Sequence, residues 1–177
     1  MNARKPKPLG KIELLVLDVD GVLTDGRLYF SGKAEALKVF HVRDGHGIKL
    51  LIGSGVEVAV VSGRSSRAVT SRMRELRVQH VVQGCGDKVA ALEILTRRLG
   101  IEPMAVACMV DDTPDLPLMC AVGFAAAVAD AHPLVLTAAH WVSQVPGGHG
   151  AVRELADALL RARAGRRGGA VAKYVPA

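Results

Sequence analysis

Four short stretches of the sequence place acidic, basic and hydroxyl side chains where apolar runs end or helices are expected to begin. They are Asp18-Val19-Asp20-Gly21, Ser62-Gly63-Arg64, Asp87-Lys88 and Asp111-Asp112-Thr113-Pro114-Asp115. Together they supply carboxylates, a hydroxyl group and a lysine, which are the groups that phosphoryl transfer needs. Each stretch alone is a weak signal, but the four in one chain predict a phosphoryl-transfer site.

Asp18 and Asp20 follow an apolar run and are separated by one residue. Because side chains alternate along a strand, both carboxylates are expected on the same side of the strand end. Two carboxylates this close repel one another, which raises the pKa of one of them. A bound cation that neutralises both charges would therefore stabilise the arrangement. Oxygen ligands suit Mg²⁺, and Asp111, at the end of another apolar run, is the expected third carboxylate. The alternative, that Asp18 and Asp20 only cap a turn, does not account for the other three stretches.

The same residue types provide a route for hydrolysing a phosphate ester. An aspartate can attack phosphorus to form an aspartyl-phosphate, and a second aspartate can protonate the leaving alcohol and then deprotonate the attacking water. Ser62 and the Gly63 amide precede a predicted helix and can donate to a phosphate there, although serine is also a common helix cap. Lys88 lies at a predicted helix start, where the helix dipole disfavours a cation, so a bound anion explains it better than a plain surface position.

Short apolar runs alternate with segments of helical spacing along the chain. The predicted strands are 12–17, 56–61, 81–82, 106–110 and 124–128, and the predicted helices are 65–76, 87–99 and 150–164. Ser65 is the expected N-cap of the first of these helices. Residues 26–42 depart from the pattern, because Ser31-Gly32 separates two alternating arms, and they predict a protruding β-hairpin. Half of the residues are hydrophobic and 3% are aromatic, which favours an α/β fold, a mostly parallel sheet covered by helices.

The positive charge of the chain is concentrated at its ends. The net charge is +6, but nine of the 23 basic residues lie within 1–11 and 161–177, which contain no acid, so 14 basic and 17 acidic residues remain between them. We expect a basic N-terminal tail over 1–11, a single domain over 12–164 and a flexible tail over 165–177. A nucleic-acid-binding module would rest on these ends alone, so no nucleic-acid partner is expected.

The cysteines and the apolar runs indicate the compartment. Cys85, Cys108 and Cys120 lack C-x-x-C spacing, so neither a disulfide scaffold nor a zinc site is expected. No apolar run approaches 20 residues, and the basic N-terminal residues precede only a short apolar stretch. These features predict a cytoplasmic protein without membrane insertion.

The four stretches resemble the four motifs of the haloacid dehalogenase superfamily of phosphatases. The segments DVDGVLTDG, FHVRDGHGIKLL, VVSGRSS, DDTPDLPLM, VGFAAAVADAHP and GGHGAVREL, in this order between residues 14 and 160, are similar to a capless subclass. Those enzymes remove phosphate from an eight-carbon sugar acid in the synthesis of lipopolysaccharide precursors. The resemblance implies an α/β fold with a three-layer Rossmann-like parallel sheet, helices on both faces, a protruding β-hairpin and no large cap domain. It also implies a homotetramer in which the hairpin helps to join subunits and a neighbour closes the active site.

The resemblance also assigns roles to residues. It implies that Asp18 is the nucleophile, that Asp20 is the acid and base and gives a backbone carbonyl to Mg²⁺, and that Asp111 is the remaining metal ligand. Asp112 and Asp115 are expected beside these ligands, and Ser62, Gly63 and Lys88 are expected to hold the phosphate. The implied sugar-binding positions are His41, Val42, Arg43, Asp44, Gly45, Lys49, Arg64 and Arg72. The four cations among them suit a sugar phosphate that also carries a carboxylate, although Arg72 fits a solvated helix face as well.

One position departs from the family pattern, and two further functions stay open. Val110 stands where the family usually has glycine, so either a special backbone conformation is lost or Val110 simply extends its strand. The substrate could instead be a sialic-acid-type nine-carbon sugar 9-phosphate, because phosphate-binding motifs do not distinguish sugars. The chain could also be a non-catalytic tetramerising domain of this family, but its intact charged motif residues argue against that.

Overall fold

A six-stranded parallel sheet forms the centre of the protein. The computed structural model describes residues 8–31 and 34–167. The strands are β1 (Leu14–Leu17), β4 (Glu57–Ser62), β5 (His80–Gln83), β6 (Val106–Val110), β7 (Phe124–Ala127) and β8 (Trp141–Val142), in the order β5-β4-β1-β6-β7-β8. Every neighbouring pair in this sheet is parallel. β1, β6 and β7 are buried along their whole length, which explains their continuous apolar sequences.

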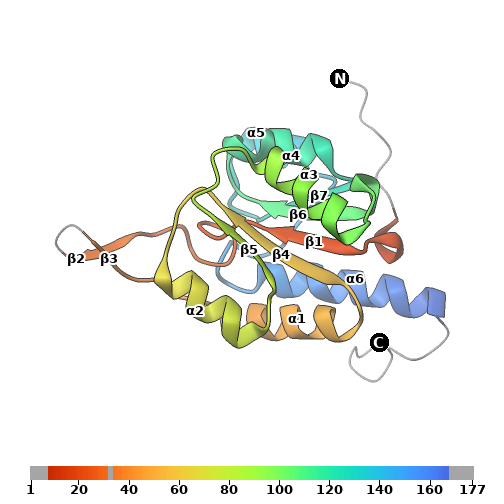
Figure 1. Ribbon diagram of the computed structural model, residues 1–177, viewed down its shortest axis with the longest axis horizontal. Coiled ribbons are helices and arrows are strands. Elements are labelled where there is room, and N and C mark those ends of the chain that lie inside the picture. Colours follow the sequence, from red (N-terminus) through yellow and green to blue (C-terminus); the bar gives the residue numbers. More distant parts are fainter. Residues whose placement is uncertain (1–7, 32–33, 168–177) are drawn as a thin grey trace.

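Helices cover both faces of this sheet (Figure 1). One layer contains α3 (Lys88–Leu99), α4 (Leu116–Ala121) and α5 (Pro133–Ala138), and the other contains α1 (Val42–Gly53), α2 (Arg67–Leu76) and α6 (Ala151–Arg167). Three 3-10 turns complete the described elements, at Leu9–Lys11, Pro103–Ala105 and Thr113–Asp115. The expected three-layer α/β fold is therefore confirmed. Within the described ranges, no helix combines the length and apolarity needed to cross a bilayer.

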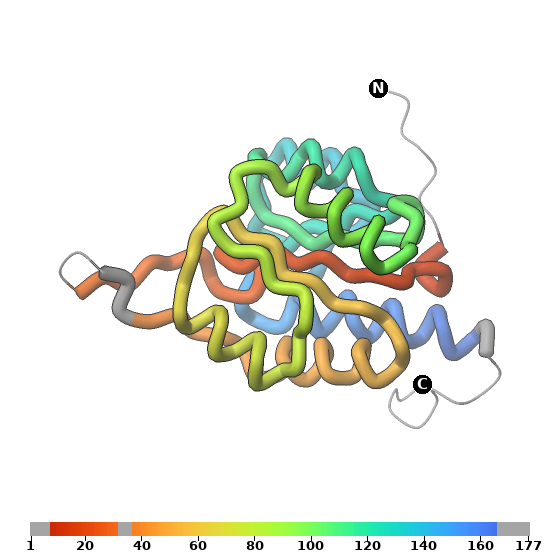
Figure 2. Tube along the Cα trace, viewed as in Figure 1, coloured from red at the N-terminus to blue at the C-terminus, as the bar shows by residue number. Residues whose placement is uncertain are grey.

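A two-stranded antiparallel hairpin projects from this body (Figures 1 and 2). It consists of β2 (Tyr29–Ser31) and β3 (Ala34–Leu37), lies in the chain between β1 and α1, and extends beyond the carboxyl end of β1. The prediction of a hairpin over 26–42 overshoots at its end, because α1 begins at Val42 and His41 is its N-cap. The part of the chain that the structure describes contains no large cap domain.

Helix α1 was not predicted, because its glycines at positions 45 and 47 are poor helix formers. The structure gives a reason for Gly47. A Cβ atom there would meet Arg153 and Ala156 of α6 at 3.1 Å, which is tighter than ordinary packing. Close approach of α1 to α6 therefore requires a very small residue at this point, at the cost of helix propensity.

The other helix limits differ slightly from expectation. The N-cap position of α2 is Ser66 rather than Ser65. Asp87 caps α3 by accepting from the Val89 and Ala90 N–H groups at 2.9 and 3.0 Å. At the other end of α3, Gly100 is in the left-handed region with φ +66°, and α6 continues to Arg167, past the expected domain limit at 164.

Part of the basic ends belongs to the body of the domain. The turn Leu9–Lys11 packs against α6. Arg163 is buried and donates to the carbonyl oxygens of Ile12 at 2.8 Å and Ser54 at 3.4 Å. It therefore joins the two ends of the domain rather than adding to a basic tail. Of the tails expected over 1–11 and 165–177, residues 1–7 and 168–177 lie outside the described residues.

Candidate active site

The four predicted stretches meet at the carboxyl ends of β1, β4 and β6, around a cavity of about 330 Å³. The predicted residues that line it are Asp18, Asp20, Ser62, Gly63, Arg64, Lys88, Asp111, Asp112 and Asp115. Gly26, Cys85, Gly86 and Pro114 line it as well, and none of them was predicted as a site residue, although Pro114 stands in the fourth stretch. The parallel sheet explains the convergence, because the ends of its strands share one edge.

Lys88 joins two of these stretches through its side chain. It is the first residue of α3, and its Nζ lies 3.1 Å from Asp18 Oδ1 and 2.7 Å from Asp115 Oδ1. Burial by itself would lower the pKa of Lys88, but the charge of Asp18 and the contact with Asp115 outweigh it, so the pKa is raised. Lys88 therefore stays charged at the centre of the site. Asp115 is more central than expected, because it anchors this lysine from a buried position.

Asp18, Asp111 and Asp115 form a carboxylate cluster. Each offers an oxygen atom, and these atoms lie within 4.8 Å of one another. Burial raises the pKa of Asp18 to about 6, against the opposing charge of Lys88. Burial and the charges of Asp18, Asp115 and Asp112 raise the pKa of Asp111 to about 7. The single charge of Lys88 therefore does not compensate the negative charge of the three carboxylates. Because the cluster offers only oxygen ligands, it fits Mg²⁺.

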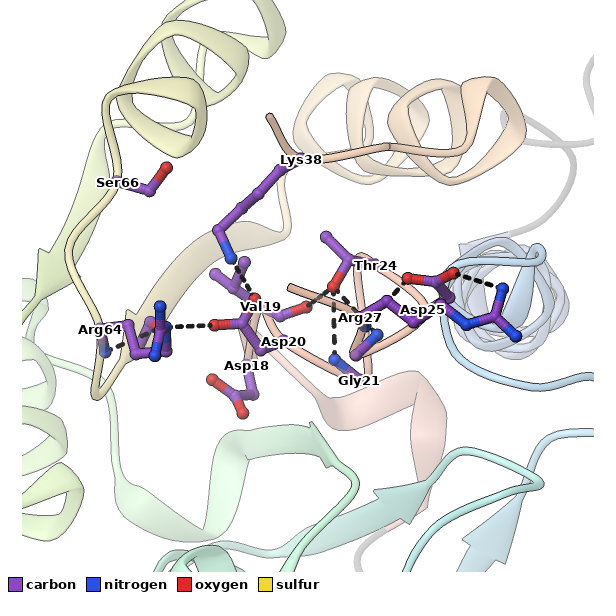
Figure 3. A network of polar contacts seen from close by, with 12 residues as sticks. Asp18, Val19, Asp20, Gly21, Thr24, Asp25, Arg27, Lys38, Arg64 and Ser66 are labelled. Carbon is purple, nitrogen blue, oxygen red and sulfur yellow. Dashed lines mark hydrogen bonds and ion pairs between the residues drawn. The ribbon is translucent and has the colours of Figure 1, made fainter. Parts of the chain in front are cut away.

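The carboxyl groups of Asp18 and Asp20 point in different directions from the loop after β1 (Figure 3). Asp20 Oδ1 forms an ion pair with Nζ of Lys38, and Asp20 Oδ2 lies 3.5 Å from Nε of Arg64. The carboxyl group of Asp20 is therefore held between two cations. Lys38 was missed in the sequence, where it is one polar residue among the alternating residues of the hairpin arm.

The loop after β1 has a hydrogen-bonded core of its own at Thr24 (Figure 3). Thr24 Oγ1 accepts from the N–H groups of Gly21 at 3.4 Å and Gly26 at 3.3 Å, and donates to the Val19 carbonyl at 3.4 Å. The Thr24 side chain is buried. These bonds fix the backbone that carries Asp18 and Asp20.

Ser62 and Gly63 lie at the end of β4, at the cavity wall. Ser62 Oγ accepts from the Arg64 N–H at 3.3 Å, and the Ser62 carbonyl accepts from the Cys85 N–H at 3.0 Å. Helix α2 begins only at Arg67. The Ser62 hydroxyl therefore belongs to a strand-end turn rather than to a helix N-terminus.

Seven of the eight positions expected to contact the sugar are not among the residues that line the cavity, and Arg64 is the exception. His41 accepts from the Arg43 N–H at 3.2 Å and caps α1. Asp44 is buried and accepts from the N–H groups of Gly150 at 3.3 Å and Arg153 at 2.9 Å.

The remaining positions lie on α1 and α2. Gly45 is buried beside the guanidinium group of Arg72. Arg72 in turn donates to Glu75 at 2.8 Å. Val42, Arg43 and Lys49 are exposed on α1. The geometry therefore gives His41, Asp44 and Arg72 contacts within the protein itself.

Val110 occupies an ordinary strand position. It is the last residue of β6, is fully buried, and pairs with Ala127 of β7. Its carbonyl accepts from the Val128 N–H at 3.3 Å. Of the two interpretations of Val110, the structure agrees with simple extension of the strand.

Comparisons with known proteins point to one group of enzymes. A family model described as haloacid dehalogenase-like hydrolase matches residues 80–155. The 3-deoxy-D-manno-octulosonate 8-phosphate phosphatase of Escherichia coli K12 is 47% identical over 152 residues, which cover 86% of this chain and 81% of the relative. The phosphatase of the same description from Yersinia pestis is 46% identical over the same shares.

Solved structures of similar proteins have the same fold. The Y. pestis phosphatase has a TM-score of 0.87 at 44% identity, covering 91% of this chain and 87% of that one. A phosphatase of the same description from Moraxella catarrhalis, solved with a magnesium ion, a phosphate ion and a KDO molecule, has a TM-score of 0.85 at 37% identity, covering 88% and 90%. Identity and fold therefore agree along most of the chain.

Proposed function

The chain belongs to the family of 3-deoxy-D-manno-octulosonate 8-phosphate phosphatases, and from that premise we propose that it hydrolyses 3-deoxy-D-manno-octulosonate 8-phosphate. The products are the free sugar acid and inorganic phosphate, and the reaction is a step in lipopolysaccharide precursor synthesis. The observation that carries the proposal is the ion pairing of one lysine, Lys88, with both Asp18 and Asp115 beside Asp111. This grouping combines a nucleophile, a phosphate-binding cation and metal ligands in one cavity.

Asp18 is the proposed nucleophile. Its carboxylate attacks phosphorus, the bond to the sugar oxygen breaks, and an aspartyl-phosphate forms. Lys88, whose Nζ lies 3.1 Å from Asp18, stabilises the negative charge on the phosphoryl oxygens during this transfer. Ser62 and Gly63 hold the same phosphate from the end of β4.

Asp20 is the proposed general acid and base. It protonates the sugar oxygen as that oxygen leaves, and it later takes a proton from the water that attacks the aspartyl-phosphate. Its carboxyl group lies in the same loop as Asp18 but makes contacts with a different set of residues. This separation supports two roles for two aspartates that are neighbours in sequence.

Asp18 and Asp111 are the proposed side-chain ligands of Mg²⁺, with the backbone carbonyl of Asp20 as a third protein ligand. The uncompensated charge of the carboxylate cluster supports a divalent cation here. When bound, Mg²⁺ offsets negative charge on the transferring phosphoryl group. We propose that Asp112 and Asp115 lie beside the metal ligands without binding the metal. Asp115 holds Lys88 in place through their ion pair.

Arg64 is the proposed contact for the carboxylate of the substrate. It lines the cavity, and its side chain is about half exposed, so it can turn toward an incoming anion. Val42, Arg43 and Lys49 are exposed on α1, and we propose that they face a neighbouring subunit in the tetramer that the family resemblance implies.

A homotetramer joined through the hairpin is part of the proposal. The hairpin and the segments beside it expose Leu28, Tyr29, Phe30, Leu37, Val39 and Val42. A two-stranded hairpin is marginally stable alone, and clustered exposed apolar side chains mark interaction surfaces. A cytoplasmic location is also proposed, and the three free cysteines support it.

A phosphate-release panel tests this function. Purified protein is given 3-deoxy-D-manno-octulosonate 8-phosphate, a nine-carbon sialic-acid-type 9-phosphate and simple hexose phosphates, each with Mg²⁺ and with a chelator. We expect Mg²⁺-dependent release that is fastest from the eight-carbon substrate. Fastest release from the nine-carbon substrate would change the assigned substrate. No release from any sugar phosphate would indicate a non-catalytic domain.

A variant with Asp18 changed is the matched control for the panel. Asp18→Asn keeps the shape of the side chain but cannot attack phosphorus, and release should fall at least about 1,000-fold. Release at the wild-type rate would exclude the aspartyl-phosphate route.

A further inference from the structure

Lys38 places a buried positive charge against the Asp20 carboxylate. It directly follows β3, which ends at Leu37, and lies three residues before His41, the N-cap of α1. Its side chain is only 2% exposed, and its Nζ forms an ion pair with Asp20 Oδ1 (Figure 3). The lysine therefore reaches Asp20 from the base of the hairpin.

Arg64 also contacts Asp20, but in a different manner. Its Nε lies 3.5 Å from Oδ2, and its side chain is 46% exposed. Solvent screens an ion pair at this distance with a partly exposed arginine, and many such pairs contribute little to stability. The two oxygens of Asp20 are therefore unequal: Oδ1 is held by a buried cation, and Oδ2 faces a residue that lines the cavity.

Burying the ammonium group of Lys38 has a cost that packing alone does not explain. A desolvated charge is unfavourable unless it is paired, and an apolar side chain of similar size usually fills such a space equally well. What an apolar side chain cannot do is fix the carboxylate of Asp20. For a group that transfers protons this matters, because a displacement of about 1 Å can lower the rate about 100-fold.

We propose that Lys38 is the positioning residue of the general acid and base: it holds Asp20 Oδ1, so that Oδ2 is the oxygen that exchanges protons with the reacting oxygen. The inference rests on the proposed function, because it assigns a partner to the acid of that reaction. Substrate binding draws Arg64 away from Oδ2 and leaves that oxygen free to act, while Lys38 stays in place.

The proton balance of this arrangement closes. Once Arg64 has left Oδ2, that oxygen takes up a proton from the solvent. As Asp18 attacks phosphorus and the bond to the sugar oxygen breaks, this proton passes to the sugar oxygen, and the free alcohol leaves. Water then attacks the aspartyl-phosphate, one of its protons returns to Oδ2, and Asp18 is released as a carboxylate. Lys38 keeps its proton throughout and stays paired with Oδ1.

Lys38 also connects the hairpin to the active site of the same subunit. Because Lys38 directly follows β3, a shift of the hairpin moves the cation that holds Asp20. The element that is proposed to join subunits therefore has a second role at the active site.

A comparison of leaving groups tests the proposal. A sugar alkoxide needs a proton to leave, whereas p-nitrophenolate leaves without one. Wild-type protein and Lys38→Met are compared with Mg²⁺, with enzyme in excess over substrate, on 3-deoxy-D-manno-octulosonate 8-phosphate and on p-nitrophenyl phosphate. We expect Lys38→Met to slow release of the sugar by about 100-fold or more, and to change release of p-nitrophenolate by less than about threefold. Exposed Lys11 provides the control, and Lys11→Met should change neither rate.

Two further variants separate positioning from folding. In Lys38→Ala, added ethylammonium should restore release of the sugar without changing release of p-nitrophenolate. Lys38→Arg keeps the charge with a longer side chain, so it should displace Asp20 and cause the same selective loss. If apolar variants at position 38 fold poorly, Lys38→Arg carries the test.

The outcomes are distinct. The proposal would be overturned if variants with the wild-type melting temperature released both leaving groups equally slowly. It would also be overturned if neither rate fell. A wild-type protein that is inactive on the sugar phosphate would instead refute the proposed function. The comparison would then use glycerol 2-phosphate, which also has an alkoxide leaving group, against p-nitrophenyl phosphate.

Discussion

The carboxylate of Asp111 occupies the space beside Gly21 that any larger side chain would need. A Cβ atom on Gly21 would collide with Asp111 Oδ2, and Gly21 has φ +85°, a conformation that other residues rarely adopt. The loop that carries Asp18 and the strand end that carries Asp111 can approach one another only because position 21 has no side chain. The glycine of the first motif therefore helps to build the carboxylate cluster.

Gly21→Ala should weaken Mg²⁺ binding roughly 10- to 100-fold, because Asp111 must move away from Asp18. Phosphate release at limiting Mg²⁺ should fall with it, and calorimetric titration with Mg²⁺ measures the affinity directly. Gly53→Ala is the matched control, since a Cβ atom there meets nothing within 4 Å. Unchanged Mg²⁺ affinity in Gly21→Ala would show that Asp111 is not needed at its present position.

Binding of Mg²⁺ should weaken as the pH falls through neutrality. In the metal-free protein the pKa of Asp111 is about 7 and that of Asp18 about 6, so protons compete with the metal below these values. The dissociation constant should be nearly constant above about pH 8, rise by up to about tenfold per pH unit between 7 and 6, and rise by up to about 100-fold per pH unit below 6, where both carboxylates are protonated. Calorimetry between pH 5.5 and 8.5 measures this, and Asp111→Asn, with one titrating group fewer, should have a shallower slope. An affinity independent of pH over this range would contradict the assignment.

The layered fold and the converging motif loops could be predicted because each depends on local sequence. Runs such as Leu14–Leu17 are apolar throughout, and a parallel sheet brings their carboxyl ends to one edge. This edge brings together Asp18, Ser62, Lys88 and Asp111, whatever the exact conformations of the loops. Helix α1 could not be predicted in this way, because Gly47 reflects its contact with α6 rather than its own helix propensity.

The contacts that sequence reasoning missed are those between segments distant in the chain. Lys38 pairs with Asp20 across 18 residues, and the backbone amides of Gly150 and Arg153 donate to Asp44 across more than 100 residues. A spacing rule relates residues within one helix or strand and carries no signal for such pairs. Burial was equally invisible, since a lysine whose side chain is 2% exposed looks like any surface lysine in the sequence.

Without metal, the charge of Asp111 should destabilise the fold at neutral and alkaline pH. Its pKa is raised in the folded protein to about 7, from an ordinary value of 3.8, so the folded state binds the proton more tightly than the unfolded state. The resulting stabilisation is fully present below about pH 4 and is lost as the pH rises through 7. Asp111→Asn has no such charge. In a chelator it should melt several degrees above wild type at pH 8, and the difference should vanish near pH 4.

Scanning calorimetry at several pH values checks this expectation. Glu102→Gln, which removes an exposed carboxylate far from the cluster, is the control and should give little change. Saturating Mg²⁺ should reverse the order at pH 8, because it binds the wild-type cluster more tightly. A wild-type protein that is more stable than Asp111→Asn at pH 8 without metal would contradict the account.

Asp44 should matter for stability rather than for substrate binding, in contrast to the sugar-binding role that the family resemblance implies. It is buried and caps the start of α6 by accepting from the N–H groups of Gly150 and Arg153. Asp44→Ala leaves both donors without this acceptor and should cost about 2 kcal/mol. For a chain of this size that lowers the melting temperature by about 4–8 °C. Asp44→Asn keeps one acceptor oxygen and should lose about half as much stability.

The KM for the sugar phosphate separates this role from substrate binding. Measured well below the melting temperature, it should stay within about twofold of wild type in both variants, because a change in KM alone indicates a lost contact with the substrate. A tenfold rise in KM with an unchanged melting temperature would instead assign Asp44 to the substrate.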